Sequence, residues 1–348
     1  MKLLIIIFNL LFIFCSASNA KNTITYSYNS DSAGFYLSKA QESRSARKIW
    51  DAEKYYKKAL EFNSNEEEIR LDFALYYIEQ RKYALALQQY SLIVAKNPNH
   101  VTAVTKQVEL SFSMRKWVDV IKYGEEAQSK GIKIEKLNYM LGKSYYEDEN
   151  YGKARKLLTE QFKETPTHRE TVTLLGAVYV EMSMYNDAIA MYQKAIESNP
   201  KDFELMYEIG LLHSAQHNER EAVKYFEMAA ANGMKQDLAF LENLGMAYLS
   251  FDIPKGVEVL NKVLEKKPGD VEILNQIAQA YYKSGNFLVA YQLFFKMFEN
   301  DTKNVKALYM AGVALIRSGD KTKGSQMCDK AIAMDPKLGE LKSQKSIL

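Results

Sequence analysis

The sequence predicts an all-helical protein, built as a solenoid of repeated helix pairs. Three observations support this prediction. A pattern of small, aromatic and apolar residues recurs about every 34 residues. A proline closes most of these copies, where it ends a helix and fixes the turn into the next one. The 348 residues include only 6 prolines and 16 glycines, which leaves few helix breakers.

Residues 1–20 have the features of a secretory signal peptide. Lys2 precedes an apolar run over residues 3–14, which is too short to span a bilayer comfortably. The sequence Ser18-Asn19-Ala20 is a small-x-small cleavage site, so we expect cleavage after Ala20. An uncleaved anchor is the alternative. The polar residues 21–32 are expected to form a flexible lead-in.

The charges of the whole chain are balanced. Lys and Arg number 46 and Asp and Glu 43, and they are interspersed, giving a formal net charge of +3. This balance gives no electrostatic case for binding nucleic acid or an anionic membrane surface. If Cys15 leaves with the signal peptide, Cys328 is the only cysteine, so an internal disulfide is excluded. Cys328 lies on an apolar helical face, where we expect a buried, inert thiol.

The repeat is clearest around Gly176. Leu175-Gly176 is followed by Tyr179, Ala188 and Tyr192, and Pro200 closes the copy. The same pattern returns along the chain and defines nine contiguous copies: 33–66, 67–100, 101–134, 135–168, 169–202, 203–237, 238–270, 271–304 and 305–338. The third copy fits worst, with Gln107, Val108, Ser111, Val120 and Gly124 at the key positions. Residues 339–348 are expected to be a C-terminal tail or a cap, with Leu338 and Leu341 covering the last pair.

This pattern resembles the tetratricopeptide repeat family, whose signature is W-x2-L-G-x2-Y followed by A-x3-F, A and P. The resemblance covers residues 33–338. It implies helix-turn-helix units that stack into a right-handed superhelical solenoid, because one pair cannot bury its apolar face alone.

Within each copy, two amphipathic segments flank a short turn. We expect the small residue of the first helix to face the small residue of the second, which lets the helices cross closely. The aromatic residues Tyr179 and Tyr192 are expected to fill the seam to the next copy. The expected packing residues are Gly142, Ala154, Gly176, Ala188, Gly210, Ala222, Gly245, Ala290 and Gly312.

No pattern in the sequence indicates catalysis, a metal or a cofactor. His213 and His217 have the i, i+4 spacing that can share a metal, but no third ligand is placed by the sequence. His213 also occupies an aromatic core position, so we interpret the pair as a packing histidine and a loop histidine. Phosphate-binding loops and serine-nucleophile motifs are absent. We therefore predict a protein that is not an enzyme.

In the family that the chain resembles, the first helix of each pair lines a concave groove that holds peptides or partner proteins. Positions two, five, nine and twelve of each copy would face that groove. Tyrosine rings with amides and a few charges suit an extended polypeptide. The expected groove residues are Tyr139, Lys143, Tyr146, Tyr207, Glu242, Asn275, Gln279, Tyr282, Lys306 and Tyr309.

These observations favour a non-enzymatic, exported scaffold that binds a protein or peptide partner of unknown identity. We expect it to act in cell-envelope assembly or secretion, in the periplasm or outside the cell. It would have no nucleic-acid partner and no membrane span once the signal peptide is removed. The alternative is a ligand-sensing or enzyme-associated subunit that binds a carbohydrate or peptidoglycan fragment in the same groove.

Overall fold

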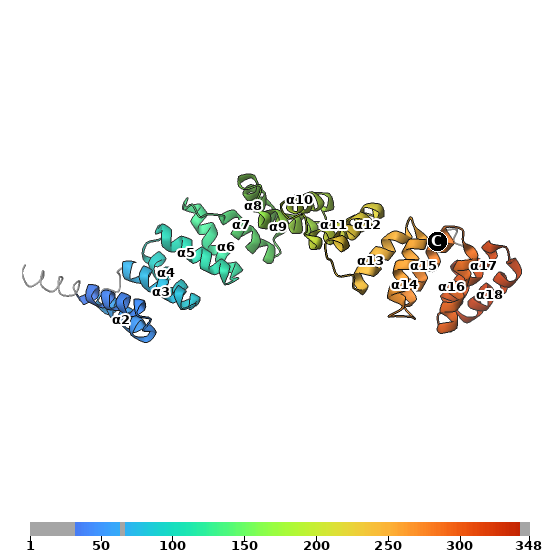
Figure 1. The fold of residues 1–348 in the computed structure, drawn as a ribbon, viewed down its shortest axis with the longest axis horizontal. Helices are drawn as coiled ribbons and strands as arrows, with labels where there is room; N and C mark the ends of the chain where they lie inside the picture. Colours follow the sequence, from blue (N-terminus) through green and yellow to red (C-terminus); the bar gives the residue numbers. More distant parts are fainter. Residues whose placement is uncertain (1–31, 63–66, 342–348) are drawn as a thin grey trace, which may run out of the picture. The chain divides into compact units, whose positions relative to one another are not determined.

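The computed structural model describes residues 32–62 and 67–341, and all regular structure within these ranges is helical (Figure 1). The predicted all-helical repeat fold is confirmed. The expected signal peptide, residues 21–31 of the lead-in and residues 342–348 of the tail lie outside the described residues. In the described part, no helix is both long and apolar enough to cross a membrane.

The chain divides into two compact units, Met1–Pro166 and Thr167–Leu348, here called unit 1 and unit 2. Unit 1 begins with a helix over residues 32–45. It continues with α2 (Ile49–Phe62), α3 (Glu67–Glu79), α4 (Tyr83–Lys96), α5 (Val101–Ser113), α6 (Trp117–Ser129), α7 (Leu137–Glu147) and α8 (Tyr151–Glu164). Unit 2 contains α9 (Arg169–Glu181), α10 (Tyr185–Ser198), α11 (Phe203–Ala215), α12 (Glu219–Ala231), α13 (Leu238–Leu249), α14 (Ile253–Leu264), α15 (Val271–Lys283), α16 (Phe287–Asn300), α17 (Val305–Ser318), α18 (Lys321–Met334) and α19 (Leu338–Leu341).

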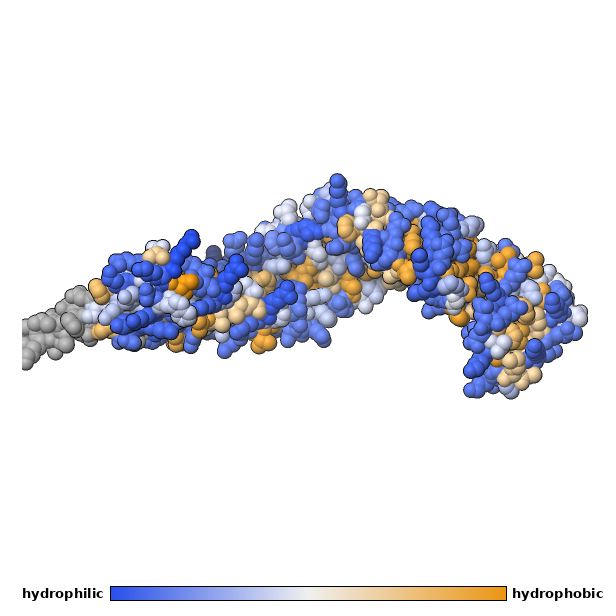
Figure 2. All heavy atoms as spheres, turned by 60° about the horizontal axis from the view of Figure 1, so that its bottom comes forward, coloured by the Kyte–Doolittle hydropathy of each residue, from blue (hydrophilic) through white to orange (hydrophobic). Residues whose placement is uncertain are grey.

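Each range that the sequence predicts as one copy contains one helix pair. Helices that follow one another in the chain pack together along each unit. Their shared apolar residues form cores between the helices, while the face drawn in Figure 2 shows mostly hydrophilic residues with smaller hydrophobic patches. At the C-terminal end, Leu338 is buried in the core beside α17 and α18, as expected for a cap.

All nine expected packing residues are buried. The expected approach of the two small residues is seen in three copies, where a Cβ atom at Gly142, Gly245 or Gly312 would lie 3.5, 3.4 or 2.8 Å from the carbonyl oxygen of Ala154, Gly256 or Gly324. A Cβ atom at Gly176 would lie 2.4 Å from Cε1 of Tyr192, and one at Gly210 would lie 2.5 Å from Cε1 of Phe226. The atoms nearest to each of these glycines belong to the side chain four residues after the small residue of the second helix. The ring of Tyr192 thus packs on the glycine of its own copy, and that it also fills the seam to the next copy stays a prediction.

In the third copy, the small and the large residue of the pattern have changed places between the two helices. Val108 stands where the neighbouring copies have glycine or alanine, and Gly124 stands where they have a large residue. A Cβ atom at Gly124 would lie 2.7 Å from Cδ2 of Leu141, in the next copy. The poor fit of this copy to the pattern is thus a compensated swap, since the bulk lost at Gly124 is filled by Leu141.

The turn between the two helices of a copy has a recurring left-handed residue. In the fifth copy it is Ser183, with φ of 57°. The N–H of Ser183 donates to the carbonyl of Val180, and the N–H of Met184 donates to that of Tyr179, both at 2.8 Å. The equivalent left-handed residues are Arg47, Arg81, Arg115, Glu149, His217, Gly285 and Gly319. His217 is therefore a turn residue, as expected.

Candidate functional site

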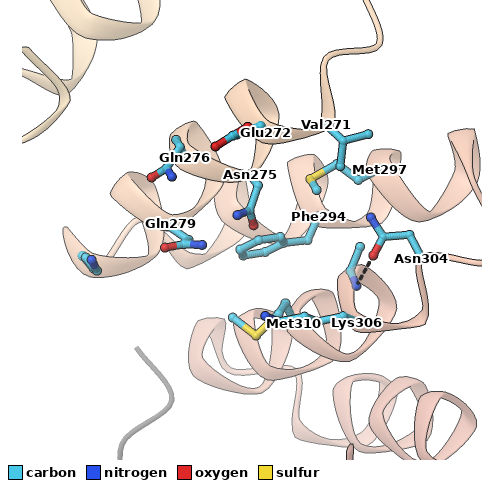
Figure 3. A pocket seen from close by; sticks show the side chains of 12 residues that line it. Val271, Glu272, Asn275, Gln276, Gln279, Phe294, Met297, Asn304, Lys306 and Met310 are labelled. Carbon is cyan, nitrogen blue, oxygen red and sulfur yellow. Dashed lines mark hydrogen bonds between the residues drawn. The ribbon is translucent and has the colours of Figure 1, made fainter. Parts of the chain in front are cut away.

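Two hollows lie on either side of α15 in unit 2. The first, of about 570 Å³, lies between α15 and α17, with residues of α16 also lining it (Figure 3). The second, of about 660 Å³, lies between α13 and α15. Residues shared by both hollows are Glu272, Gln276, Gln279 and Lys283. We call these four residues, together with Asn275, the α15 stripe.

The spacing of the α15 stripe explains why its members share one face. Glu272, Gln276, Gln279 and Lys283 are separated by four, three and four residues, which corresponds to successive turns of a helix. Asp270 fixes the start of α15, because its Oδ1 accepts hydrogen bonds from the N–H groups of Glu272 and Ile273 at 3.1 and 3.2 Å. The stripe is thus carried by a helix with a capped and defined beginning.

The stripe offers polar groups with no partner in the described part of the chain. No hydrogen bond within residues 32–62 and 67–341 engages the side-chain amides of Asn275, Gln276 and Gln279. In the same residues, Glu272 and Lys283 form no ion pair. Each amide can both donate and accept hydrogen bonds. In Figure 3, Asn275 lies above the ring of Phe294, and Gln279 lies beside that ring.

The apolar base beneath the stripe is largely covered. Only 1% of Phe294 and 4% of Met297 is exposed. On the opposite side, Asn304 caps α17 by accepting from the N–H of Ala307 at 3.2 Å (Figure 3). The hollow therefore presents polar groups to an occupant over a tightly packed base.

Four of the expected groove residues line these hollows. Asn275, Gln279 and Lys306 line the first, and Glu242 and Gln279 line the second. The sequence reasoning missed Glu272, Gln276 and Lys283. Their spacing from Gln279 on one helical face was the signal that could have found them.

Two of the expected groove tyrosines, Tyr207 and Tyr282, pack against other aromatic side chains. The hydroxyl of Tyr207 accepts from Nδ2 of Asn243 at 2.7 Å. Its ring packs on Phe226 and Phe240, at centroid distances of 5.4 and 5.6 Å. Tyr282 is half-buried and meets Phe287 edge to face at 5.1 Å. Neither ring lines the two hollows, so their contribution is to packing.

Tyr309 does not belong to an exposed surface, and its assignment to the groove was wrong. Only 5% of it is exposed, and it lies in the apolar core shared with Phe298 and Leu338. Burial raises the pKa of its hydroxyl. The physical reason is that the ring gains more from burial beside these apolar neighbours than it would from a solvated position.

The remaining expected groove residues belong to unit 1. Tyr139 meets Phe112 edge to face at 5.9 Å. Lys143 pairs with Glu147 at 2.5 Å and also lies 5.1 Å from the ring centroid of Tyr146. The charge of Lys143 is therefore already balanced within the chain, unlike the charges of the α15 stripe.

Three of the histidines pack against an aromatic ring or cap a helix. His213 stacks on Tyr225 at a centroid distance of 5.5 Å, and burial lowers its pKa. His100 and His168 cap helices α5 and α9. Among the residues that the structure describes, no group of three His, Cys, Asp or Glu side chains is placed to hold a metal ion. Cys328 is buried, as expected.

Comparison with known proteins identifies the repeat. Residues 173–237 and 305–338 match models of the tetratricopeptide repeat. The chain is 27% identical over 179 residues to "Cellulose synthase operon protein C" of Pseudomonas fluorescens, which covers 48% of this chain and 14% of that protein. It is 24% identical over 145 residues to "BBSome complex member BBS4" of Bos taurus, which covers 40% of this chain and 27% of that protein. The matched segments thus span a small part of these relatives.

Among solved structures, the C-terminal part of a tetratricopeptide-repeat protein from Cytophaga hutchinsonii is similar. It is 20% identical, with a TM-score of 0.49, and the alignment covers 69% of this chain and 96% of that one.

Proposed function

This chain is a tetratricopeptide-repeat protein, and from that premise we propose that it is a non-enzymatic scaffold. Its occupant is an extended peptide segment of a partner protein, bound in unit 2 across the α15 stripe. The binding surface consists of the two hollows beside α15, and α15 carries most of the polar contacts.

The observation that carries this proposal is the set of unpartnered amides on α15. A peptide main chain alternates N–H donors with carbonyl acceptors, and it needs partners for both when it is held on a surface. Asn275, Gln276 and Gln279 each supply a donor and an acceptor. Glu272 and Lys283 add one charge of each sign near opposite ends of the helix, which suits a segment that carries both signs.

A carbohydrate is the competing occupant. In its favour, the chain resembles a protein whose name refers to a cellulose synthase operon. A sugar ring commonly stacks on an open aromatic face, but Phe294, the aromatic residue of the first hollow, is 1% exposed. The lining of the second hollow contains no aromatic residue. We therefore favour the peptide.

The test is selection of peptides from a random phage-displayed library on the purified protein, followed by calorimetric titration. The variant Asn275→Ala/Gln276→Ala/Gln279→Ala should lose affinity for the selected peptide at least tenfold. This corresponds to about 1.4 kcal/mol or more. The matched control, Asn261→Ala/Gln292→Ala/Gln326→Ala, also removes one Asn and two Gln amides, here from exposed positions on α14, α16 and α18.

Equal affinity in both triple variants would reject the α15 stripe as the binding surface. Soluble glucans and peptidoglycan fragments form the second arm of the experiment. If they bind the wild type but not the α15 variant, while no peptide is selected, the carbohydrate replaces the peptide as the occupant. Circular dichroism spectra verify that all variants retain the helical fold.

We also propose that the protein is exported and acts in the cell envelope. The basis is the sequence of residues 1–20, with cleavage expected after Ala20. Mass spectrometry of the N-terminal peptide from fractionated cells tests this proposal. It should find Lys21 as the first residue in the envelope or the medium, whereas an intact Met1 in the cytoplasm would contradict it.

A further inference from the structure

Three consecutive turns of unit 1 have the same pattern of residues, and this pattern plays no part in the site proposed on α15. Each joins the two helices of one copy, and each has Arg-Lys followed by two residues that are aromatic or aliphatic. The three turns are Arg47-Lys48-Ile49-Trp50, Arg81-Lys82-Tyr83-Ala84 and Arg115-Lys116-Trp117-Val118. Both tryptophans of the chain, Trp50 and Trp117, lie in these turns. We call the three turns together the basic edge.

The backbone of the three turns is the same. Arg47, Arg81 and Arg115 are left-handed, with φ of 56°, 56° and 55°. The N–H of Arg47 donates to the carbonyl of Arg44 at 3.0 Å. The equivalent bonds from Arg81 and Arg115 each measure 2.9 Å. Because the copies stack in sequence within unit 1, equal turn geometry places the three turns along the same edge of that unit.

The basic edge presents apolar side chains to solvent. Trp50 is 85% exposed and Val118 is 73% exposed, while Ile49 and Tyr83 are 42% and 40% exposed. A largely exposed tryptophan gains nothing from the core of its own chain. Several exposed apolar side chains along one edge, Trp50 among them, indicate a surface that a binding partner covers.

Most of the Arg and Lys side chains of the basic edge form no ion pair within the described residues. Arg47, Arg81 and Arg115 are exposed, and none has an ion pair in the described residues 32–62 and 67–341. Lys82 pairs with Glu53 at 2.9 Å, and Lys116 lies 3.8 Å from Asp119. A hollow of about 370 Å³ adjoins the first turn, lined by Arg44, Ser45, Arg47, Ile49, Tyr76, Glu79 and Gln80.

The later copies lack this composition. In five of the six later copies the corresponding pairs are Glu149-Asn150, Ser183-Met184, His217-Asn218, Gly285-Asn286 and Gly319-Asp320, and in the seventh copy Phe251-Asp252 precedes α14. The net charge of +3 for the whole chain therefore conceals a local concentration of basic residues. The balanced charge of the whole chain therefore does not exclude an anionic surface as the partner of this edge.

We propose that the basic edge docks unit 1 peripherally on a membrane surface that contains anionic phospholipids. The guanidinium groups would contact lipid phosphates, which they can bind through two parallel hydrogen bonds. Trp50, Tyr83 and Val118 would enter the interfacial layer, where tryptophan and tyrosine are enriched in membrane proteins. The exposed apolar tips favour a lipid surface over a soluble polyanion, which would engage only the cations.

The tryptophans make this inference directly measurable. The purified protein is mixed with vesicles of phosphatidylcholine alone, or of phosphatidylcholine with phosphatidylglycerol. With anionic vesicles, we expect a blue shift of the tryptophan emission and quenching by brominated lipid. With neutral vesicles, both effects should be much weaker. Trp50→Phe should remove most of the shift, because Trp117 is half-buried and packs on Phe112.

Charge reversal tests the cations. The variant Arg47→Glu/Arg81→Glu/Arg115→Glu should bind anionic vesicles about a hundredfold more weakly in a flotation assay. The control Lys96→Glu/Lys133→Glu/Lys163→Glu makes the same charge change at exposed residues of unit 1 that lie near the C-terminal ends of α4 and α8 and between α6 and α7, away from the three turns. It should retain most of the binding. Since every variant has the same N-terminus, the apolar residues 3–14 contribute equally to all of them.

Three outcomes would overturn the proposal. Equal losses in both triple variants would show that only net charge matters. Vesicle binding without a change in tryptophan emission would show that another surface docks. Binding to soluble polyglutamate or heparin with the same emission shift, and none to anionic vesicles, would replace the membrane with an acidic polymer.

Discussion

At Gly176, the lack of a side chain determines how closely α9 and α10 approach each other. The ring of Tyr192 occupies the space that a Cβ atom would need, with only 2.4 Å between them. That is shorter than any ordinary contact, so a methyl group there must displace a buried ring. The same arrangement recurs at Gly142 against Leu158, where the distance is 2.6 Å.

Replacing Gly176 with alanine should therefore destabilise the protein. We expect a loss of about 1–3 kcal/mol from overpacking, and a larger loss for Gly176→Leu. Urea denaturation followed by circular dichroism measures the effect. Gly152→Ala is the control, because a Cβ atom at Gly152 would meet nothing within 4 Å. An unchanged midpoint for Gly176→Ala would mean that the ring can move without cost.

The left-handed turn residue gives a second prediction at the residue scale. Ser183 has φ of 57°, a conformation that costs a residue with a Cβ atom about 1 kcal/mol. Ser183→Gly should raise the stability by about 0.5 kcal/mol, since the flexibility of glycine in the unfolded chain offsets part of the gain. Conversely, Gly285→Ala, at φ of 82°, should lower stability by about 1 kcal/mol. Thermal melting compares the two, and shifts of the same sign would contradict this account.

At the scale of helices, a recurring trio of side chains joins one copy to the next. The hydroxyl of Tyr248 in α13 donates to Glu227 in α12. Lys255 in α14 pairs with the same carboxylate at 3.1 Å and lies 4.3 Å from the ring centroid of Tyr248. Equivalent trios are Tyr145, Glu125 and Lys153, and Tyr77, Glu53 and Lys82.

Removing the hydroxyl should weaken the contact between α12 and α13. We expect Tyr248→Phe to cost about 1 kcal/mol, the low end for a hydrogen bond to a charged group, because Glu227 is half exposed. Denaturant titration measures the change. Tyr281→Phe is a suitable control, since no hydrogen bond of its hydroxyl is found in the described residues. Equal losses in both variants would mean that the hydroxyl of Tyr248 adds nothing.

The same trio predicts a dependence on pH. The hydrogen bond from Tyr248, together with Lys255, lowers the pKa of Glu227 below its ordinary value of 4.5. A carboxyl group with a depressed pKa in the folded state stabilises the protein above its unfolded pKa. That contribution disappears as the pH falls through the folded pKa. Between pH 7 and pH 3, Glu227→Gln should therefore lose less stability than the wild type, and a parallel loss would refute the assignment.

For single helices, the sequence predicted the fold well because the packing pattern is local. The small residues and the closing prolines recur at fixed spacing, and each helix pair mainly contacts its neighbours. The swap between Val108 and Gly124 was not foreseen, because the compensating side chain, Leu141, belongs to the next copy. Compensation of this kind depends on contacts between copies, which the pattern within one copy does not record.

At the scale of the whole molecule, the candidate site was predicted only in part. Position within a copy identified Asn275 and Gln279, which line the first hollow, but the same rule also selected Tyr309, which is buried. Exposure at a given position depends on the size of the neighbouring side chains, so one rule cannot hold for every copy. The basic edge was not predicted either, because the net charge of the whole chain does not show that basic residues recur at one position in three copies.

We propose a different task for each of the two units. Unit 2 carries unpartnered amides over a covered apolar base, whereas unit 1 carries cations beside exposed apolar tips. One surface suits a peptide segment and the other suits an anionic bilayer. The variants proposed for each surface lie in separate units, so each task can be removed while the other is retained.

The most direct test of the central claim is site-specific photo-crosslinking in the native cells. A photoreactive phenylalanine analogue is placed at Gln276 on α15, or at Gln292, which is exposed on α16. The account predicts that position 276 forms an adduct with one segment of a partner protein and that position 292 does not. A free peptide of that segment should then compete for the adduct. Adducts of equal yield at both positions, or adducts at position 292 alone, would contradict peptide binding at the α15 stripe.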